Sequence, residues 1–319
     1  MDLKQLKTFI RVAEAGSLSR ASDLLRLAQP ALSRQVKLLE TSVGTELFTR
    51  HGRGMELTEA GRELLARVSG ILHQLETSID EVRTLKSVPR GAVALGLMPS
   101  VSDLLAARLA LRVAAELPGV SLRIVEGYAG NLVDWLHRGE LDATLLYGPS
   151  SDLHLRVTSL LFEELHLVGP ASSRLDPRAG CTIKSLHTFP LVLPSRTHGL
   201  RAVVEAAARK ARVDLELKFE ADSYRVLKDL VAAGLGYTVL PPSAIRRELA
   251  AGTLRSASFR SPKLQREIVL ALPSSRPDTR ATTAVTAIVV DEIARTIASE
   301  AWLAMPVSKA AKTPKPARA

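Results

Sequence analysis

The stretch Ala28–Glu40, "AQPALSRQVKLLE", brings hydrogen-bond donors and cations together at helical spacing. On a helical wheel with about 100° per residue, one arc of about 120° holds Pro30, Ser33, Arg34, Lys37 and Glu40. Such a face can contact nucleic acid, because the major groove of DNA admits a helix and an arginine can donate two hydrogen bonds to one guanine. An ordinary solvated helix face is the alternative that this stretch leaves open.

The opposite side of the same stretch is apolar and consists of Leu32, Val36 and Leu39. Pro30 suits the first turn of a helix, where its missing N–H costs nothing. We therefore expect a helix that buries its leucine-rich side and offers its polar side to a partner, with Gln29 at its entry.

A second group of polar residues follows three expected strands. The segments "MPSVSD", "GYAGN" and "PSRTHG" place near expected helix N-termini the residues Ser100, Ser102, Asn131, Ser195, Thr197 and His198. Ligands in open α/β sheets bind beyond the carboxyl ends of the strands, and helix N-termini with hydroxyl groups favour anions. We hypothesise a small carboxylate or similar anion between the serines of the first segment and Thr197 and His198, with Arg196 adding charge. Each of these residues is equally explained as a helix N-cap.

The elements around the opening stretch predict a helix-turn-helix. A first amphipathic helix, ending at Gly16, carries Leu3, Leu6, Ile10 and Ala13. Ser17 or Ser19 can cap a second short helix, whose apolar residues are Ala21, Leu24 and Leu25. With the opening stretch these make three short helices joined by tight connections.

Residues 47–58, "LFTRHGRGMELT", interrupt the helical pattern. Gly52 and Gly54 bracket Arg53, which predicts a β-hairpin with a basic tip. In a winged helix-turn-helix such a hairpin lies along the DNA backbone, and a plain surface turn is the alternative.

A long helix is expected from Thr58, a plausible N-cap, to about residue 87. Its apolar residues recur with a period near 3.5 and form one row of Leu64, Val68, Ile71, Leu75, Val82 and Leu85, beside a second row of Leu65, Leu72 and Ile79. This pattern predicts a coiled-coil dimer, although a helix packed on its own domain would show a similar pattern.

After "SVPRGAV" the pattern changes to apolar strands alternating with helices, which predicts parallel α/β sheets. Roughly 210 residues are long for one such sheet, so we expect two lobes. The final stretch, "MPVSKAAKTPKPARA", is rich in Pro, Ala and Lys, contains four basic residues and no acidic one, and is expected to be disordered.

The net charge of +10 suits nucleic acid or an anionic ligand as a partner. The single cysteine, Cys181, cannot form an internal disulfide, and the charged start "MDLKQLKTFI" differs from a signal peptide. No run of about 18 uncharged apolar residues is present. We therefore expect a cytoplasmic protein without a membrane span.

Other classes of function explain less of the chain. An enzyme is disfavoured because no GxSxG, P-loop, HExxH or GxGxxG pattern occurs, so we expect no catalytic residues, metal ligands or cofactor. A solute-binding protein would account for the α/β lobes and leave the first 90 residues unexplained. A DNA-binding repressor without a ligand stays open.

The segment "LKQLKTFIRVAEAGSLSRASDLLRLAQPALSRQVKLLETSVGTELFTRHGRGMELTEAG" closely resembles the start of LysR-type transcriptional regulators. The segments "RGELDATLLYG" and "LKDLVAAGLGYTVLPPSA" resemble parts of that family's effector domain. The resemblance covers roughly residues 1–300 and is strongest to the branch that contains the nitrogen assimilation control protein.

This resemblance implies an α/β multidomain protein: a winged helix-turn-helix, a long linker helix and a two-lobed effector domain like periplasmic binding proteins. It implies a homotetramer, a dimer of dimers, that bends double-stranded promoter DNA and responds to a small-molecule effector, with RNA polymerase as a further partner. The residues expected to bind DNA are Ser17, Gln29, Pro30, Ser33, Arg34, Lys37 and Arg53.

The expected boundaries follow. Residues 1–58 form the DNA-binding domain and 59–88 the linker helix. Residues 89–302 form the effector domain, and 303–319 a disordered basic tail. Within the effector domain, one lobe takes about 91–161 with 267–300 and the other about 162–266.

Overall fold

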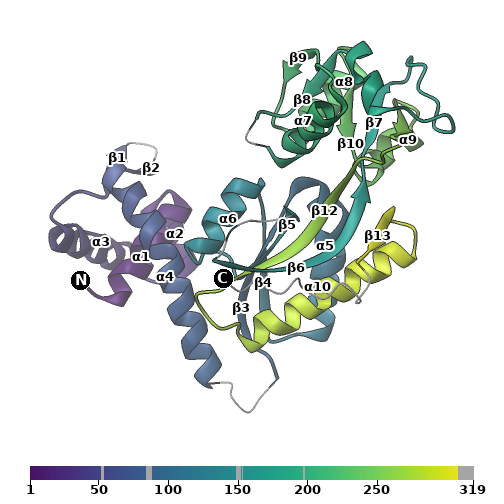
Figure 1. Ribbon diagram of the computed structural model, residues 1–319. Helices are drawn as coiled ribbons and strands as arrows, with labels where there is room; N and C mark the ends of the chain where they lie inside the picture. Colours follow the sequence, from purple (N-terminus) through teal and green to yellow (C-terminus); the bar gives the residue numbers. More distant parts are fainter. Residues whose placement is uncertain (52–53, 84–87, 149–151, 153, 197, 308–319) are drawn as a thin grey trace, which may run out of the picture. The chain divides into compact units, whose positions relative to one another are not determined.

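The computed structural model describes residues 1–51, 54–83, 88–148, 152, 154–196 and 198–307 (Figure 1). The chain divides into two compact units. The N-terminal unit contains Met1–Arg83 with His137–Glu140, and the C-terminal unit contains Thr84–Leu136 and Leu141–Ala319. Of the residues singled out above, Gly52, Arg53, Leu85, Thr197 and the four basic residues of the tail lie outside the described part.

The N-terminal unit begins with the three expected helices, α1 (Leu3–Ala15), α2 (Leu18–Leu25) and α3 (Gln29–Val43). Asp2 and Gln5 form a capping box at the start of α1, and Gly16 ends this helix in the left-handed conformation. The Ser17 side chain caps α2 by accepting the Arg20 N–H, as one of the two expected serines. A hairpin of β1 (Phe48–His51) and β2 (Gly54–Leu57) follows, so the predicted wing is present.

The core of this unit confirms the orientation of α3 and corrects that of α2. Leu32, Val36 and Leu39 are buried, as the helical wheel predicts. In α2, Leu24 is 73% exposed and Leu18 is buried in its place. An eight-residue helix buries only one narrow stripe, and here α2 turns Leu18 and Ala21 inward.

Helix α4 (Glu59–Arg83) begins where expected, with the Thr58 hydroxyl accepting the Gly61 N–H at 3.0 Å. Its first turns pack on the core of their own unit through Leu64, Leu65 and Val68. Further along, three hydrophobic side chains are exposed, namely Ile71, Leu75 and Ile79. The self-packed alternative thus applies to the first half of α4, and its second half carries an exposed apolar row.

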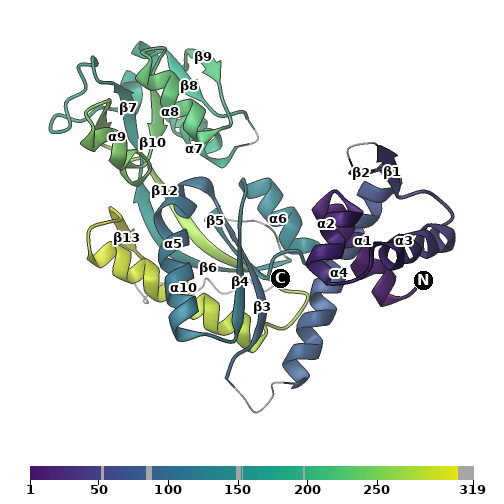
Figure 2. The same cartoon turned by 180° about the vertical axis from the view of Figure 1, so that it is seen from behind.

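The C-terminal unit has two lobes, each with its own hydrophobic core. In the first lobe a six-stranded sheet has the order β13-β6-β12-β5-β3-β4. Its strands are β3 (Gly91–Leu97), β4 (Val120–Glu126), β5 (Ala143–Gly148), β6 (Leu155–Glu164), β12 (Gln265–Pro273) and β13 (Ala304–Pro306). Helices α5 (Pro99–Glu116) and α10 (Arg280–Ala298) lie side by side against it (Figures 1 and 2), and α6 (Ala129–His137) completes the lobe.

The second lobe contains two small sheets, of order β10-β7-β11 and β8-β9. Its strands are β7 (His166–Pro170), β8 (Leu191–Leu193), β9 (Leu217–Glu220), β10 (Thr238–Leu240) and β11 (Leu254–Ser258). Its helices are η1 (Ile183–Thr188), α7 (Gly199–Ala211), α8 (Tyr224–Ala232), η2 (Pro242–Ile245) and α9 (Arg246–Ala250).

Strands β6 and β12 connect the two lobes. They pair antiparallel along their length, and the residues just beyond them, Leu165 and Leu264, belong to the second lobe's core. The expectation of wholly parallel sheets is therefore wrong. Among the described strands, β3 pairs parallel with β4 and β5, and β8 with β9, whereas the other strand pairs are antiparallel. β6 and β12 run in opposite directions because the chain leaves the first lobe on one and returns on the other.

The expected disorder from residue 303 onward is also corrected for its first residues. Strand β13 pairs with β6, with Ala304 opposite Glu163. Just before it, Trp302 is only 1% exposed. Burial of this large aromatic side chain holds the segment on the sheet, and composition alone did not reveal this anchor.

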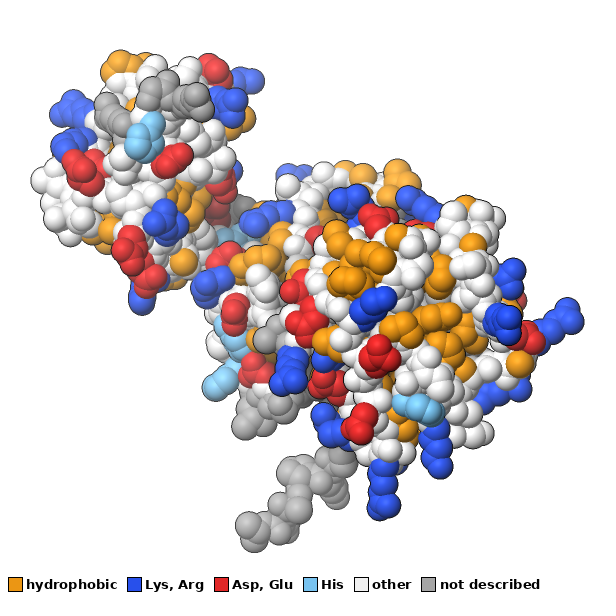
Figure 3. All heavy atoms as spheres, turned by 90° about the horizontal axis from the view of Figure 1, so that it is seen from above, with side chains coloured by type: hydrophobic (Ala, Val, Ile, Leu, Met, Phe, Trp, Pro, Cys, Tyr) orange, Lys and Arg blue, Asp and Glu red, His pale blue; other side chains and the backbone are white. Residues whose placement is uncertain are grey.

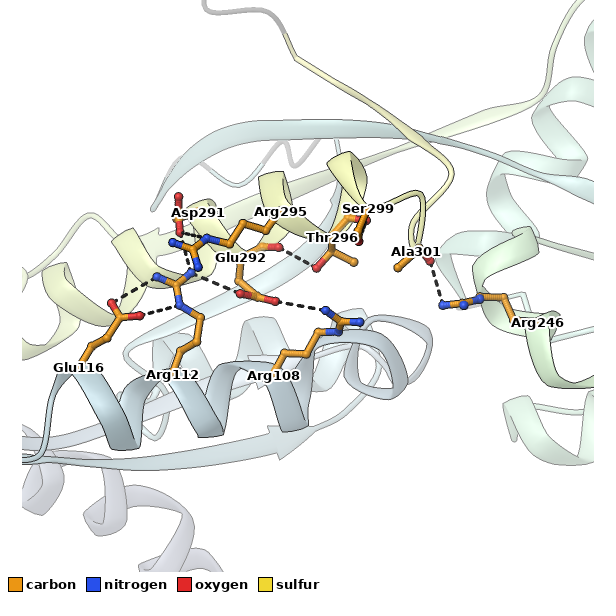
Figure 4. A network of polar contacts seen from close by, with 10 residues as sticks. All are labelled: Arg108, Arg112, Glu116, Arg246, Asp291, Glu292, Arg295, Thr296, Ser299 and Ala301. Carbon is orange, nitrogen blue, oxygen red and sulfur yellow. Dashed lines mark hydrogen bonds and ion pairs between the residues drawn. The ribbon is translucent and has the colours of Figure 1, made fainter.

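Helices α5 and α10 are joined by a network of ion pairs (Figure 4). The Arg112 guanidinium donates to Glu116 at 2.7 Å, to Asp291 at 2.7 Å and to the buried Glu292 at 3.3 Å. These carboxylates raise the pKa of Arg112 above its ordinary value, Glu116 contributing most. The network fixes α10, and with it the start of the C-terminal segment, on the first lobe.

On the face seen in Figure 3, hydrophobic side chains are interspersed with Lys, Arg, Asp and Glu. No helix among the described residues is long and apolar enough to cross a membrane.

Candidate functional site

The polar side of α3 is the first candidate site. Gln29, Pro30, Arg34 and Lys37 are exposed, and Ser33 is half-buried. The fifth residue of the predicted arc, Glu40, is turned toward the wing instead. Its Oε1 accepts the N–H groups of Leu47 at 3.0 Å and Phe48 at 3.4 Å. Glu40 therefore holds the start of β1 against α3.

The wing is also tied to the turn between α1 and α2. The Met55 N–H donates to the Gly16 carbonyl at 2.9 Å. A Cβ on the neighbouring Gly54 would lie 2.6 Å from that oxygen, and its φ of +147° favours glycine. Both ends of the hairpin are thus fixed to the helices, and α3 and the wing form one surface in the N-terminal unit.

The second candidate site is a small pocket in the C-terminal unit, partly open to solvent, with a cavity volume of about 30 Å³. It is mainly apolar and aromatic. Its walls are formed by Pro99, Ser100, Tyr128, Tyr147, Pro194, His198, Leu200, Asp222, Tyr224, Leu227, Leu240, Pro241 and Arg266. Both lobes contribute, with Ser100 at the start of α5 in one and His198 at the start of α7 in the other.

A buried ion pair forms the base of one wall. Arg266 and Glu163 face each other across β12 and β6 and are 4% and 1% exposed. The Arg266 Nε donates to Glu163 Oε2 at 2.7 Å, and its Nη2 donates to the Ser100 hydroxyl at 3.0 Å. Burial alone would lower the pKa of Arg266, but the Glu163 carboxylate and the Tyr147 side chain together outweigh burial and raise it. The guanidinium also lies over the Tyr147 ring, 4.2 Å from its centroid.

At another wall of the pocket, side chains of both lobes meet. The Tyr128 hydroxyl of the first lobe donates to the Asp222 carbonyl of the second. The His198 ring packs edge-on against Tyr128, with centroids 5.1 Å apart. Burial, and then the positive charge of Arg266, lower the pKa of His198, so its imidazole is neutral at neutral pH.

Asp222 gives this wall a negative charge. The Ser195 N–H donates to its carboxylate at 2.8 Å, and this bond lowers the pKa of Asp222 below its ordinary value. The pocket therefore has a cationic side at Arg266 and an anionic side at Asp222.

Two family models match the chain. The model of the LysR substrate binding domain matches residues 86–294, and that of the bacterial regulatory helix-turn-helix protein, lysR family, matches residues 3–62. The chain belongs to the LysR family of transcriptional regulators.

Relatives of this LysR-family regulator cover it almost end to end. It is 33% identical over 280 residues to the HTH-type transcriptional regulator BbuR of Bordetella bronchiseptica, covering 88% of this chain and 86% of that protein. It is 33% identical over 271 residues to the nitrogen assimilation regulatory protein nac of Klebsiella aerogenes, covering 85% and 88%. This agrees with the branch that the sequence resembled.

Solved structures share its fold. Full-length CbnR complexed with its target DNA superposes with a TM-score of 0.67 at 20% identity, covering 93% of this chain and 100% of that one. Oxidized OxyR of Corynebacterium glutamicum gives 0.56 at 26% identity, covering 94% of each chain. The chain is thus a DNA-binding transcriptional regulator with a substrate-binding domain, and its family is not enzymatic.

The structure brings together some of the predicted effector-site residues of this LysR-family regulator. Ser100 and His198 both line the pocket. Ser102, two residues further along α5, is half-buried and does not line the pocket, and Ser195 contacts the lining residue Asp222 through its backbone N–H. Asn131 is exposed on α6, and Thr197 lies outside the described residues. In the DNA-binding set, Ser17 acts as the cap of α2.

Sequence reasoning missed the aromatic walls and the ion pair. Tyr128 lies in the segment "GYAGN", from which Asn131 was selected, and Tyr147 ends the strand "LDATLLYG". Arg266 and Glu163 stand in the mostly apolar segments "REIVLALP" and "LLFEELHL", which also contain Glu267, Glu164 and His166. A charge in such a run is the available signal of a buried pair, since an unpaired charge is rarely buried. Among the described residues no group of three or more His, Cys, Asp and Glu could hold a metal.

Proposed function

We propose that this protein reads double-stranded promoter DNA through α3 and the wing, and that a small monoanion in the pocket controls this binding. The exposed polar side of α3, held by a buried leucine side, is the observation that carries the DNA-binding part. Gln29, Ser33 and Arg34 are proposed to face base edges, and Lys37 to contact phosphate. Ser17, Pro30 and Arg53 are proposed to contact DNA beside them.

The monoanion is supported by the chemistry of the walls. A carboxylate beside Arg266 and Ser100 would meet a guanidinium and a hydroxyl at the first turn of α5. Asp222 on the other wall repels a second negative charge. The aromatic and proline side chains favour an apolar body for the rest of the effector.

The assembly is proposed to be a dimer through the exposed apolar row of α4, and a dimer of such dimers on DNA. Ile71, Leu75 and Ile79 are exposed in the single chain at helical spacing, which a second copy of α4 would cover. A cytoplasmic location and contact with RNA polymerase complete the proposal.

Two experiments test it. Genome-wide footprinting of bound DNA with the intact protein and with Arg34→Ala should give discrete sites for the first and lose them for the second. Thermal unfolding with acetate, acetamide, benzoate and benzamide should show stabilisation by a carboxylate over its neutral amide. Equal shifts for acid and amide would remove the anion from the proposal.

A further inference from the structure

The segment that follows α10 forms a strap over the junction of the two lobes. We use the name C-terminal strap for residues 299–307. Its Trp302 side chain is buried and donates its indole N–H to Glu163 Oε1 at 2.8 Å. Beyond it, β13 pairs with β6, and the Val307 N–H donates to the Leu160 carbonyl at 3.0 Å.

Glu163 is the point where the strap, the pocket and the second lobe meet. Its Oε1 accepts from Trp302 and from the Ser243 hydroxyl of η2, the latter at 2.5 Å. Its Oε2 accepts from Arg266, which lines the pocket. One buried carboxylate thus has donors from the strap, from the second lobe and from a pocket wall.

The strap also contacts both lobes directly. The backbone N–H of Trp302 donates to the Thr296 carbonyl at 3.1 Å, at the end of α10 that the Arg112 network fixes. From the second lobe, Arg246 donates to the Ala301 carbonyl at 3.2 Å (Figure 4). A change in the donors around Glu163 therefore reaches a segment joined to both lobes.

We propose that Glu163 and Trp302 are positioning residues for Arg266, and that together they relay an anion in the pocket to the C-terminal strap. Trp302 and Ser243 orient Glu163, and Glu163 holds the guanidinium against the Tyr147 ring and Ser100. A carboxylate that arrives beside Ser100 competes with Glu163 for the same guanidinium. Glu163 then changes its hydrogen bonds with Trp302 and Ser243. These changes alter how the strap and the second lobe are held at Glu163.

The competition is strong because the site is buried. Charges in a low-dielectric interior interact several times more strongly than in water, and a buried carboxylate that loses a donor must find another. The donors that Glu163 keeps are Trp302 and Ser243, which already share its Oε1. The relay needs no movement longer than a side-chain rotation.

A carboxylate built into the protein tests the relay without knowledge of the effector. Ser100→Asp places one within reach of Arg266 at the first turn of α5, and Ser100→Asn has the same shape without the charge. Both are made with Trp135→Phe, which leaves Trp302 as the sole tryptophan. The readouts are the emission spectrum of Trp302 and hydrogen exchange of its indole N–H.

The S100D protein should differ from the S100N protein in both readouts, with indole exchange changed about tenfold. Identical spectra and exchange rates for the two variants would overturn the relay. If Ser100→Asp does not fold, Ser243→Ala removes a donor that shares Oε1 with Trp302 and should shift the same signals. Ser185→Ala, a hydroxyl bonded elsewhere, is its control. Unchanged signals in Ser243→Ala would equally overturn the relay.

Two parts of this inference rest on the proposed function, namely the anion in the pocket and the last step, to DNA. Promoter affinity should differ between S100D and S100N, and Trp302→Phe, which keeps the ring and lacks the N–H, should abolish that difference. A difference that persists in full without the indole N–H would remove Trp302 from the relay. A Trp302 response with equal promoter affinities would leave the relay standing and refute pocket control of DNA binding.

Discussion

The DNA-facing surface of the N-terminal unit and the pocket of the C-terminal unit are built in opposite ways. The polar residues of α3 come from nine consecutive positions, 29–37, and are exposed or half-buried. The pocket is lined by Ser100 and Arg266, and Glu163 pairs with Arg266 behind it; the three residues are far apart in the chain and almost fully buried. A local surface can change its contacts at little cost in stability, whereas a buried long-range site links its ligand to the fold. The predictions below test this difference, from the largest expected effect to the smallest.

The largest effect is expected from Glu163→Ala. It leaves Arg266 buried without its partner, and removal of one member of a buried pair costs about 3–5 kcal/mol of the free energy of unfolding. Urea denaturation measures this. The neighbouring Glu164 pairs with the exposed Lys263, so Glu164→Ala should cost about 1 kcal/mol or less. Equal losses for the two variants would contradict the assignment of Glu163 to a structural junction.

The second effect concerns assembly. Leu75→Glu puts a charge into the exposed apolar row of α4 and should weaken the dimer about 100-fold, since burying an unpaired charge costs about 3 kcal/mol or more. Sedimentation equilibrium gives the dissociation constant. Leu24→Glu changes an even more exposed leucine of the same unit and should leave the constant as it is. A dimer that tolerates Leu75→Glu would show that the row is not the contact.

Arg34→Ala should lower promoter affinity by about 1–3 kcal/mol and relax specificity at one base pair, with the stability of the fold unchanged. Lys37→Ala, on the same face, should weaken binding to all sequences alike and reduce its salt dependence. Titrations of promoter and scrambled DNA at two salt concentrations separate the two outcomes. If both variants lose only sequence-independent binding, α3 does not read bases.

The smallest effect is a pH dependence from His198. Burial lowers its pKa, so the folded state binds the proton less well than the unfolded chain does. Its contribution to stability is fully present above the ordinary pKa of about 6.5 and is lost as the pH falls through the folded pKa. Urea denaturation across this range should show a shallower pH dependence in His198→Gln, and identical slopes would exclude His198 as the group.

What the sequence could predict follows the same division. Amphipathic periodicity and capping residues are local features, so α1, α3, the wing and the start of α4 could be predicted from the sequence. Leu32, Val36 and Leu39 face inward as predicted. The side of a short helix that is buried could not be predicted, as the exposed Leu24 shows, because the neighbouring elements determine which side of α2 is buried.

Less of the pocket could be predicted from the sequence. Ser100 and His198 could be placed because they follow strands, where α/β folds bind ligands. The pairing of Glu163 with Arg266 depends on the register of β6 and β12, strands about 100 residues apart that pattern analysis had to find separately. β6 and the short β13 were not expected at all. Without these two strands, the burial of Trp302 against Glu163 could not be predicted.

The central claim, that the pocket controls DNA binding, is tested most directly by measuring promoter affinity at saturating carboxylate and carboxylate affinity with and without promoter DNA. The carboxylate used is the one, acetate or benzoate, that raises the thermal unfolding temperature most relative to its own amide. The account predicts an affinity change of about 5- to 150-fold, equal in both directions, because coupling between two sites is reciprocal. Promoter affinity that stays the same while the carboxylate occupies the pocket would contradict it.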